Sequence, residues 1–256
     1  MTIDEILKNY NKLGTEIIES IFTYNYLSIG GTESTEMLAG LANISANSRV
    51  LDVGSGVGGP SMHLAATYKC RVTGLDLVEL NVRQANDRAK ARSLTHLAKF
   101  KVGNALTMPF EDNSFDVVWG QDAWCHVPDK TKLFEEVTRV LTPVGKVAFT
   151  DWVQTCQMER SELSKLLSAM AAPNIATATD YRRFLELLDY TIIVQDDISD
   201  VFISQYRRIM AEFARTKQSF SERYSPKIYN IVMDRNQCIL KGFESGALGG
   251  TRIVAQ

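Results

Sequence analysis

A glycine-rich segment between an apolar run and a helical pattern is the part of the chain best suited to hold a ligand. Residues 52–59 read DVGSGVGG. Glycines at such a turn let the backbone approach a ligand closely, and the N-terminus of the following helix offers N–H groups to an anion. The segment also satisfies the GxGxxG pattern of dinucleotide-binding loops, which is weak evidence when it stands alone.

Two acids distinguish between the ligands that such a loop holds. Asp52 lies two residues before Gly54, where a pyrophosphate would be repelled by a carboxylate. An acid there suits a ligand with a positive amino group, such as S-adenosylmethionine (SAM), which carries an ammonium, a carboxylate and a sulfonium and no phosphate. Asp76, at the end of the next predicted strand, can accept hydrogen bonds from both ribose hydroxyls, and NAD enzymes use an acid in the same way. Asp76 therefore indicates a ribose without choosing the cofactor.

Further motifs follow in order, at residues 103–105 (GNA), 115–116 (FD) and 139–143 (RVLTP). Together with Asp52, the glycine loop and Asp76, this set over residues 48–151 resembles the class I SAM-dependent methyltransferases. A nicotinamide-dependent dehydrogenase and a glycine turn without a ligand are the alternatives. The resemblance implies SAM as cofactor, S-adenosylhomocysteine as product, and cofactor contacts from Tyr10, Ser28, Asp52, Gly54, Ser55, Gly56, Asp76, Leu77, Asn104, Ala105 and Gln121. Asn104 stands where the family usually has Asp, and its side-chain carbonyl can still accept from the adenine amino group.

The flanking residues narrow the class. Tyr10, residues 26–31 (YLSIGG) and residues 121–126 (QDAWCH) resemble the N-methyltransferases of phosphoethanolamine and of glycine, sarcosine and dimethylglycine. This resemblance runs from Tyr10 to Trp152. It implies that Tyr10 and His126 form a catalytic pair.

Methyl transfer to an amine needs alignment, exclusion of water and a proton acceptor. An ordinary amine is protonated at neutral pH, and histidine is suited to accept its proton. We therefore expect His126 to act as the base and Tyr10 to orient it. An acid can face the cationic amine, and aromatic faces can contact a methylated ammonium. The candidate substrate contacts are Tyr26, Asp122, Trp124, His126 and Trp152; for each aromatic residue, core packing is the alternative.

The substrate half of the chain departs from the phosphoethanolamine enzymes, which bind phosphate with Tyr and Arg residues after the fifth strand. Trp152 replaces the first Tyr, and residues 171–174 (AAPN) contain neither residue type. An unpaired phosphate in a closed site is costly, so sarcosine or dimethylglycine is the preferred substrate, with an amine-bearing natural product also open. The Arg182–Arg183 and Arg207–Arg208 pairs read as solvated helix charges, one of which could instead bind a substrate carboxylate.

Two other functions stay open. The same core serves C- and O-methyltransferases of quinone-, sterol- or tocopherol-like rings, which would need a long apolar cavity beside the sulfonium. A SAM-binding protein without catalysis would need no base. The cavity beside the cofactor distinguishes an amine N-methyltransferase from a ring C- or O-methyltransferase, because a small polar cavity favours an amino acid.

Composition excludes several classes. The 256 residues carry a net charge of −2, whereas a general nucleic-acid binder needs a basic stripe. No apolar run approaches the ~20 residues of a membrane helix, and the N-terminal residues lack the pattern of a signal peptide. The four cysteines form no CxxC pair, which makes a metal or redox site unexpected. We expect a cytoplasmic enzyme with a small-molecule substrate, no metal, and no stable membrane or nucleic-acid partner; composition leaves its oligomeric state open.

Strand and helix patterns alternate through the centre of the chain. Short apolar strands are predicted at 49–53, 71–76, 100–102, 115–121 and 146–151, with helices between them. Such alternation predicts a Rossmann-like α/β fold with a doubly wound, mostly parallel sheet. The predicted organisation is a helical N-terminal cap (1–45), a SAM-binding core (46–155), a helical lid insertion (156–190), and C-terminal strands and helices that complete the sheet (191–256).

Overall fold

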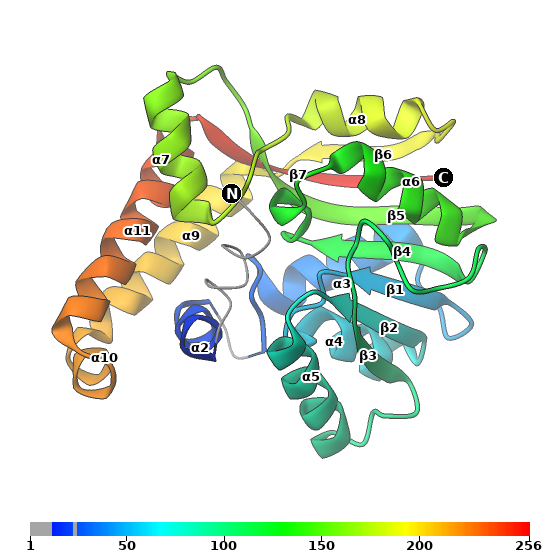
Figure 1. The fold of residues 1–256 in the computed structure, drawn as a ribbon, viewed down its shortest axis with the longest axis horizontal. Coiled ribbons are helices and arrows are strands. Elements are labelled where there is room, and N and C mark those ends of the chain that lie inside the picture. The colour runs from blue at the N-terminus through cyan, green and yellow to red at the C-terminus, as the bar shows by residue number, and fades with distance from the viewer. Residues whose placement is uncertain (1–11, 23–24) are drawn as a thin grey trace.

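The centre of the molecule is a seven-stranded sheet in the order β3-β2-β1-β4-β5-β7-β6 (Figure 1). The computed structural model describes residues 12–22 and 25–256. All neighbouring pairs from β3 to β5 are parallel, and β7 runs antiparallel between β5 and β6. The predicted Rossmann-like, mostly parallel α/β fold is therefore confirmed. The strands are β1 (Arg49–Val53), β2 (Arg71–Asp76), β3 (Ala98–Val102), β4 (Phe115–Gln121), β5 (Leu141–Gln154), β6 (Ile192–Asp197) and β7 (Leu248–Ala255).

Helices cover both faces of the sheet, which explains why its central strands β1, β4 and β7 are buried at nearly every position. Val50 packs against one layer and the next residue, Leu51, against the other. The first layer is α3 (Gly31–Ala42), α4 (Gly59–Tyr68) and α5 (Glu79–Ala91); the second is α6 (Lys130–Val140) and α8 (Ala178–Glu186). A short 3₁₀ helix, η1 (Trp124–His126), follows β4.

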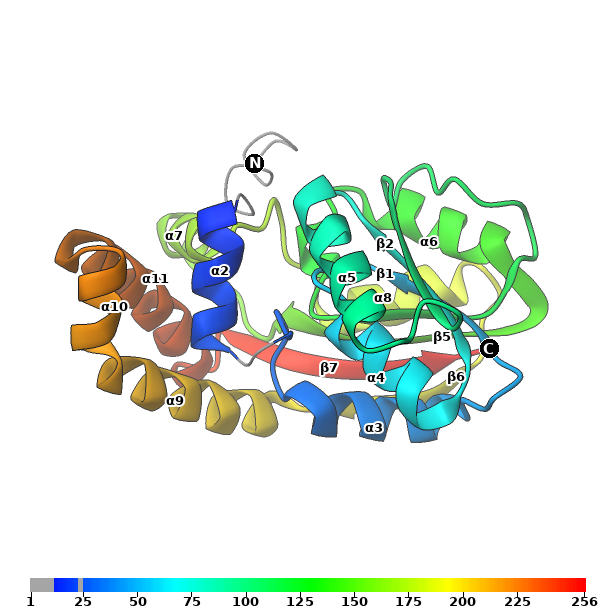
Figure 2. The same ribbon diagram turned by 90° about the horizontal axis from the view of Figure 1, so that it is seen from below.

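The remaining helices form a cap beside the carboxyl ends of the parallel strands (Figures 1 and 2). Their apolar side chains pack into two clusters of their own, separate from the two layers of the sheet. The cap helices are α2 (Lys12–Ile21), α7 (Arg160–Met170), α9 (Ser199–Arg215), α10 (Lys217–Arg223) and α11 (Pro226–Glu244).

The predicted boundaries of the lid are wrong at two places. Helix α8 does not belong to a lid: Tyr181 and Leu185, one turn apart, are fully buried against the sheet. Strands β6 and β7 do complete the sheet, whereas α9 to α11, which lie between them in the sequence, form the cap, with Phe202 of α9 packed against Gly250 of β7. An amphipathic pattern shows that one face of a helix is buried, but not which surface covers it.

Removing the hydroxyl of Tyr181 tests the placement of α8. The Tyr181 hydroxyl donates to Asp151 on β5, and Asp151 is fully buried. Tyr181→Phe leaves that carboxyl without this donor, so we expect a loss of about 1–3 kcal/mol in the free energy of unfolding, measured by urea denaturation. Leu187→Ala, at a position 70% exposed, is the control and should change it by less than about 0.5 kcal/mol. Equal midpoints for Tyr181→Phe and wild type would contradict this placement.

Candidate active site

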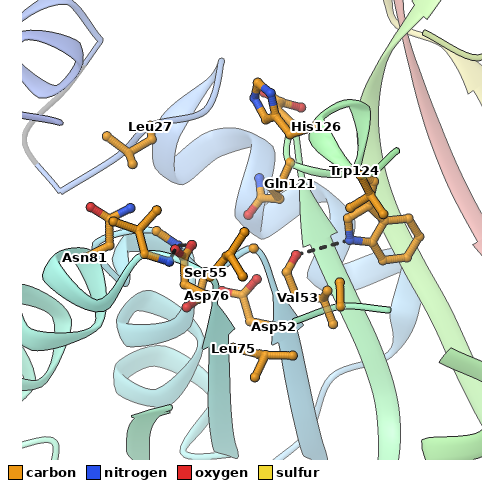
Figure 3. A pocket seen from close by; sticks show the side chains of 18 of the residues that line it. Leu27, Asp52, Val53, Ser55, Leu75, Asp76, Asn81, Gln121, Trp124 and His126 are labelled. Carbon is orange, nitrogen blue, oxygen red and sulfur yellow. Dashed lines mark hydrogen bonds between the residues drawn. The ribbon is translucent and has the colours of Figure 1, made fainter. Parts of the chain in front are cut away.

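A chamber lies at the carboxyl ends of β1, β2 and β4, where the strand order reverses (Figure 3). This is the position at which open α/β sheets bind ligands. Its walls come from the loop after β1, the end of β2, the turns after β3 and β4, and the segment that follows α2. Residues far apart in the sequence thus meet because their strands end at one edge.

The loop after β1 depends on its glycines. Gly54 and Gly56 have φ angles of 83° and 52°, in the left-handed region that favours glycine. A Cβ on Gly54 would lie 2.5 Å from the Cβ of Ala123. The Gly54 and Ser55 N–H groups donate to the Leu75 carbonyl at 2.8 and 3.1 Å, so the loop is tied to the end of β2.

Two buried carboxyls flank this loop. Asp52 accepts a hydrogen bond from the Ser61 hydroxyl at 2.6 Å, and burial raises its pKa to about 7. Asp76 accepts from the Gly56 and Val78 N–H groups, both at 2.8 Å; burial raises its pKa as well. A cation in the chamber would favour the ionised form of both acids.

Other polar atoms in this chamber suit the carboxylate and the adenine of SAM, the cofactor that the sequence predicts. Among the described residues, Ser28 Oγ and Ser55 Oγ are buried lining atoms without a hydrogen-bond partner. Asn104 Oδ1 already accepts from the Leu106 N–H at 2.9 Å, so only its second lone pair is left for an adenine amino group. Gln121 borders the chamber but is held by α3: its Oε1 accepts from Thr35 at 2.9 Å.

A second chamber of about 280 Å³ adjoins the first, and both are lined by Leu27, Asp122 and His126. Its walls come mainly from the cap. Among the described residues they combine apolar and polar side chains, and also contain Leu13, Gly14, Ile17, Ile18, Ile21, Phe22, Cys125, Trp152, Met170, Tyr206, Val232, Arg235, Asn236 and Ile239.

His126 is the base candidate in the wall that the two chambers share. Its Nδ1 lies 3.0 Å from the Ala171 carbonyl. A carbonyl only accepts, so Nδ1 carries the proton and the lone pair resides on Nε2. Burial, together with the charges of Lys130 and Arg235, lowers the pKa of His126 to about 4. The imidazole is therefore neutral at pH 7 and able to accept a proton.

Lys130 and Asn174 hold together the turn that follows His126 and the turn that carries Ala171. Lys130 Nζ donates to the Val127 carbonyl and, at 2.8 Å, to Asn174 Oδ1. Asn174 Nδ2 donates to the Pro128 carbonyl at 2.7 Å. The turn after His126 is thus fastened to the turn after α7, which carries Ala171. Nothing in the sequence motifs pointed to Lys130.

Asp122 places a carboxyl in the shared wall. Its Oδ2 accepts from the Ile29 N–H and its Oδ1 from the Thr150 hydroxyl, both at 2.7 Å. Burial raises the pKa of Asp122 to about 7. The residue therefore braces the N-terminal segment against β5, and its charge lies between the two chambers.

The other residues predicted at the site lie in different places. Tyr10 lies outside the described residues. Tyr26 is buried beside Gly59 and lines neither chamber. Trp152 lines the second chamber. Trp124 is a correction: its indole is 1% exposed, stacks on Phe149 and donates to the Val53 carbonyl at 3.1 Å (Figure 3), so its faces are not available to a cation.

The arginine in the second chamber is Arg235 and not a member of the two predicted pairs. Arg182, Arg183, Arg207 and Arg208 are exposed and line neither chamber. Arg235 Nε instead donates to the Ala169 carbonyl at the end of α7. A sequence signal existed: Arg235 and Asn236 interrupt the face of α11 that carries Val232 and Ile239, at helical spacing.

Residues 12–22 and 25–256 contain no group of three or more His, Cys, Asp or Glu residues placed to hold a metal. None of the helices in these two ranges is long and apolar enough to span a membrane.

The doubly wound sheet, the glycine loop and the acids at the ends of β1 and β2 define the methyltransferase class whose cofactor is SAM. Comparison with known proteins agrees: residues 51–149 match the family described as a methyltransferase domain.

Curated relatives refine the comparison. The chain is 34% identical over 184 residues to the glycine/sarcosine/dimethylglycine N-methyltransferase of Actinopolyspora halophila, covering 72% of this chain and 33% of that protein. It is 28% identical over 228 residues to the phosphoethanolamine N-methyltransferase of Plasmodium falciparum (isolate 3D7), covering 88% and 84% of the two. The chain spans 33% to 47% of the first curated relatives it matches.

One solved structure shows the same fold over the whole chain. It is Haemonchus contortus phosphoethanolamine N-methyltransferase 2 in complex with SAM, with a TM-score of 0.91 at 22% identity. The match covers 100% of this chain and 60% of that one.

The raised pKa of Asp122 predicts how stability depends on pH. Between about pH 4 and pH 7 the folded state keeps a proton that the unfolded state has released, so the free energy of unfolding falls as pH rises. Asp122→Asn should make this slope shallower by up to about 1.4 kcal/mol per pH unit, measured by urea denaturation of the ligand-free protein. Asp87→Asn, at an exposed position on α5, should keep the wild-type slope. An unchanged slope for Asp122→Asn would show that Asp122 is ionised throughout.

Proposed function

We propose that this chain is a SAM-dependent N-methyltransferase of a small amine. The observation that carries the proposal is the position of His126: a neutral imidazole with its lone pair on Nε2, in the wall between two adjoining chambers. One chamber has the acids and serine hydroxyls that suit SAM. The other has room for an acceptor.

In this proposal the first chamber holds the cofactor. Asp76 accepts from the ribose hydroxyls, Asp52 adds a negative charge near the ammonium, and Ser28 and Ser55 donate to the carboxylate. Bound SAM supplies an electrophilic methyl group on its sulfonium. The protein aligns this group with the acceptor and excludes water.

The second chamber prepares the acceptor nitrogen. Burial and the positive charges of Lys130 and Arg235 lower the pKa of His126, and they would lower the pKa of an amine beside it for the same reason. His126 Nε2 then accepts the amine proton, and the nitrogen lone pair becomes nucleophilic. The negative charge of Asp122 stabilises the cationic nitrogen before and after methyl transfer.

Two features favour sarcosine- or dimethylglycine-like acceptors over a phosphate ester. Arg235 is the arginine that lines the second chamber, and it suits a single carboxylate. The turn after α7 is made of Ala171, Ala172, Pro173 and Asn174, and the Asn174 amide is engaged by the Pro128 carbonyl. The relative from Actinopolyspora halophila carries these substrates in its name.

A second candidate is methylation of carbon or oxygen on an apolar ring. The apolar side chains of α2 and α11 in the second chamber favour it. Labelled methyl in an apolar product, with none in any amine, would select this function. SAM binding without turnover on any acceptor would instead select a non-catalytic protein.

The cofactor site is tested by Asp76→Ala. Loss of a charged hydrogen-bond acceptor should weaken SAM binding about 10- to 150-fold, measured by isothermal titration calorimetry with a melting curve as a folding check. Asp116→Ala is the control, because Asp116 pairs with Arg49 at the other end of the sheet and should leave the affinity unchanged. Equal affinity for Asp76→Ala and wild type would mean that the cofactor site is assigned wrongly.

The base is tested by His126→Gln. With methyl-labelled SAM and glycine, sarcosine, dimethylglycine or phosphoethanolamine, kcat should fall about 10²- to 10⁴-fold while SAM affinity stays within a few-fold. Products are read by mass spectrometry. His63→Gln, on α4 beside Glu36, is the matched control. Wild-type turnover in His126→Gln would remove this residue from the mechanism.

A further inference from the structure

The second chamber is larger than sarcosine or dimethylglycine requires. It encloses about 280 Å³, whereas an apolar cavity of about 150 Å³ holds a benzene ring. Dimethylglycine is close to benzene in size, so roughly half of the chamber would stay unfilled. The chamber therefore has room for an acceptor with an additional group.

Two polar groups of the chamber, His126 and Arg235, are held at the end of α7. His126 donates to the carbonyl of Ala171, and Arg235 donates to the carbonyl of Ala169, two residues earlier. The imidazole of His126 and the guanidinium of Arg235 are thus both held by backbone carbonyls at the end of α7. An acceptor that carries both a nitrogen and a carboxylate matches this arrangement.

The described wall also contains Asp122 and the hydrogen-bonded side chains of Tyr206 and Asn236, and an apolar part lies on α2 and α11. Ile17, Ile18 and Phe22 of α2 line it together with Val232 and Ile239 of α11. With a small acceptor this surface would stay in contact with water, which loses the free energy of apolar burial. An apolar side chain would cover it.

We propose that the acceptor is an α-amino acid, or its N-methyl derivative, with an apolar side chain. Its carboxylate lies at Arg235, its nitrogen between Asp122 and His126, and its side chain against α2 and α11. This inference rests on the proposed N-methylation and specifies its substrate.

The methyl transfer consumes only SAM and the amino acid. The amino acid enters as its ammonium form and gives a proton to His126 Nε2. The nitrogen lone pair forms the bond to the methyl carbon as the carbon–sulfur bond breaks. The electron pair of that bond stays on sulfur, which leaves as S-adenosylhomocysteine, and the proton passes to solvent.

The test compares acceptors that grow by apolar carbon atoms. The full chain is assayed with labelled SAM and glycine, alanine, valine, leucine and phenylalanine, and with phenethylamine, which lacks the carboxylate. Each buried methylene should raise kcat/KM about fourfold, so leucine or phenylalanine exceeds glycine by more than about tenfold. Phenethylamine should fall about tenfold or more below phenylalanine.

Two variants assign these preferences to the chamber. Arg235→Gln should lower kcat/KM for phenylalanine about tenfold or more relative to that for phenethylamine, so that the preference for the carboxylate is lost; Arg207→Gln, an exposed cation paired with Glu244, should keep it. Ile18→Trp fills the apolar part of the chamber and should reverse the series in favour of glycine.

The outcomes separate this inference from the function on which it rests. If sarcosine or dimethylglycine is the best acceptor, or if the series shows no dependence on size, N-methylation stands and the apolar acceptor is wrong. If no amine is methylated while SAM binds, the proposed function itself fails.

Discussion

The hydrogen bond from His126 Nδ1 to the Ala171 carbonyl is the interaction on which the proposed chemistry depends. It places the proton on Nδ1, and so it leaves the lone pair on Nε2. It also joins the turn after β4 to the end of α7, two parts of the chain that would otherwise be independent. Lys130 and Asn174 repeat this link with charged and amide groups. A base whose tautomer is set by a cap helix is correctly oriented only when the cap is docked.

The second constraint on the site is the burial of its acidic side chains. Asp52 and Asp122 are buried at the carboxyl ends of parallel strands, and burial raises the pKa of each to about 7. Isolated buried carboxylates are costly, and hydrogen bonds from Ser61, Thr150 and backbone N–H groups offset only part of this cost. A cationic ligand offsets more, because it stabilises the ionised form. Both acids are therefore placed to face a positively charged ligand.

The sequence allowed the core and the cofactor chamber to be predicted, because both depend on local patterns. Apolar strands end in Asp52 and Asp76 whatever surrounds them, and parallel strands bring such ends to one edge. The cap depended on contacts between distant segments. The helical pattern of 178–186 and that of 199–215 look alike, yet one helix covers the sheet and the other lies in the cap. Trp124 shows the same limit, since its neighbour Phe149 decides that it packs in the core.

Helix α2 connects the two chambers through charges as well as apolar contacts. Glu19 makes two hydrogen bonds to Arg88 on α5, at 2.7 and 2.8 Å, and Thr15 donates to Asn81 at 3.1 Å. Asn81 in turn stabilises the ionised form of Asp76, whose pKa it lowers by a hydrogen bond. The opposite side of α2 lines the second chamber. One helix thus contacts the residue that bonds Asp76 in the first chamber and forms part of the wall of the second.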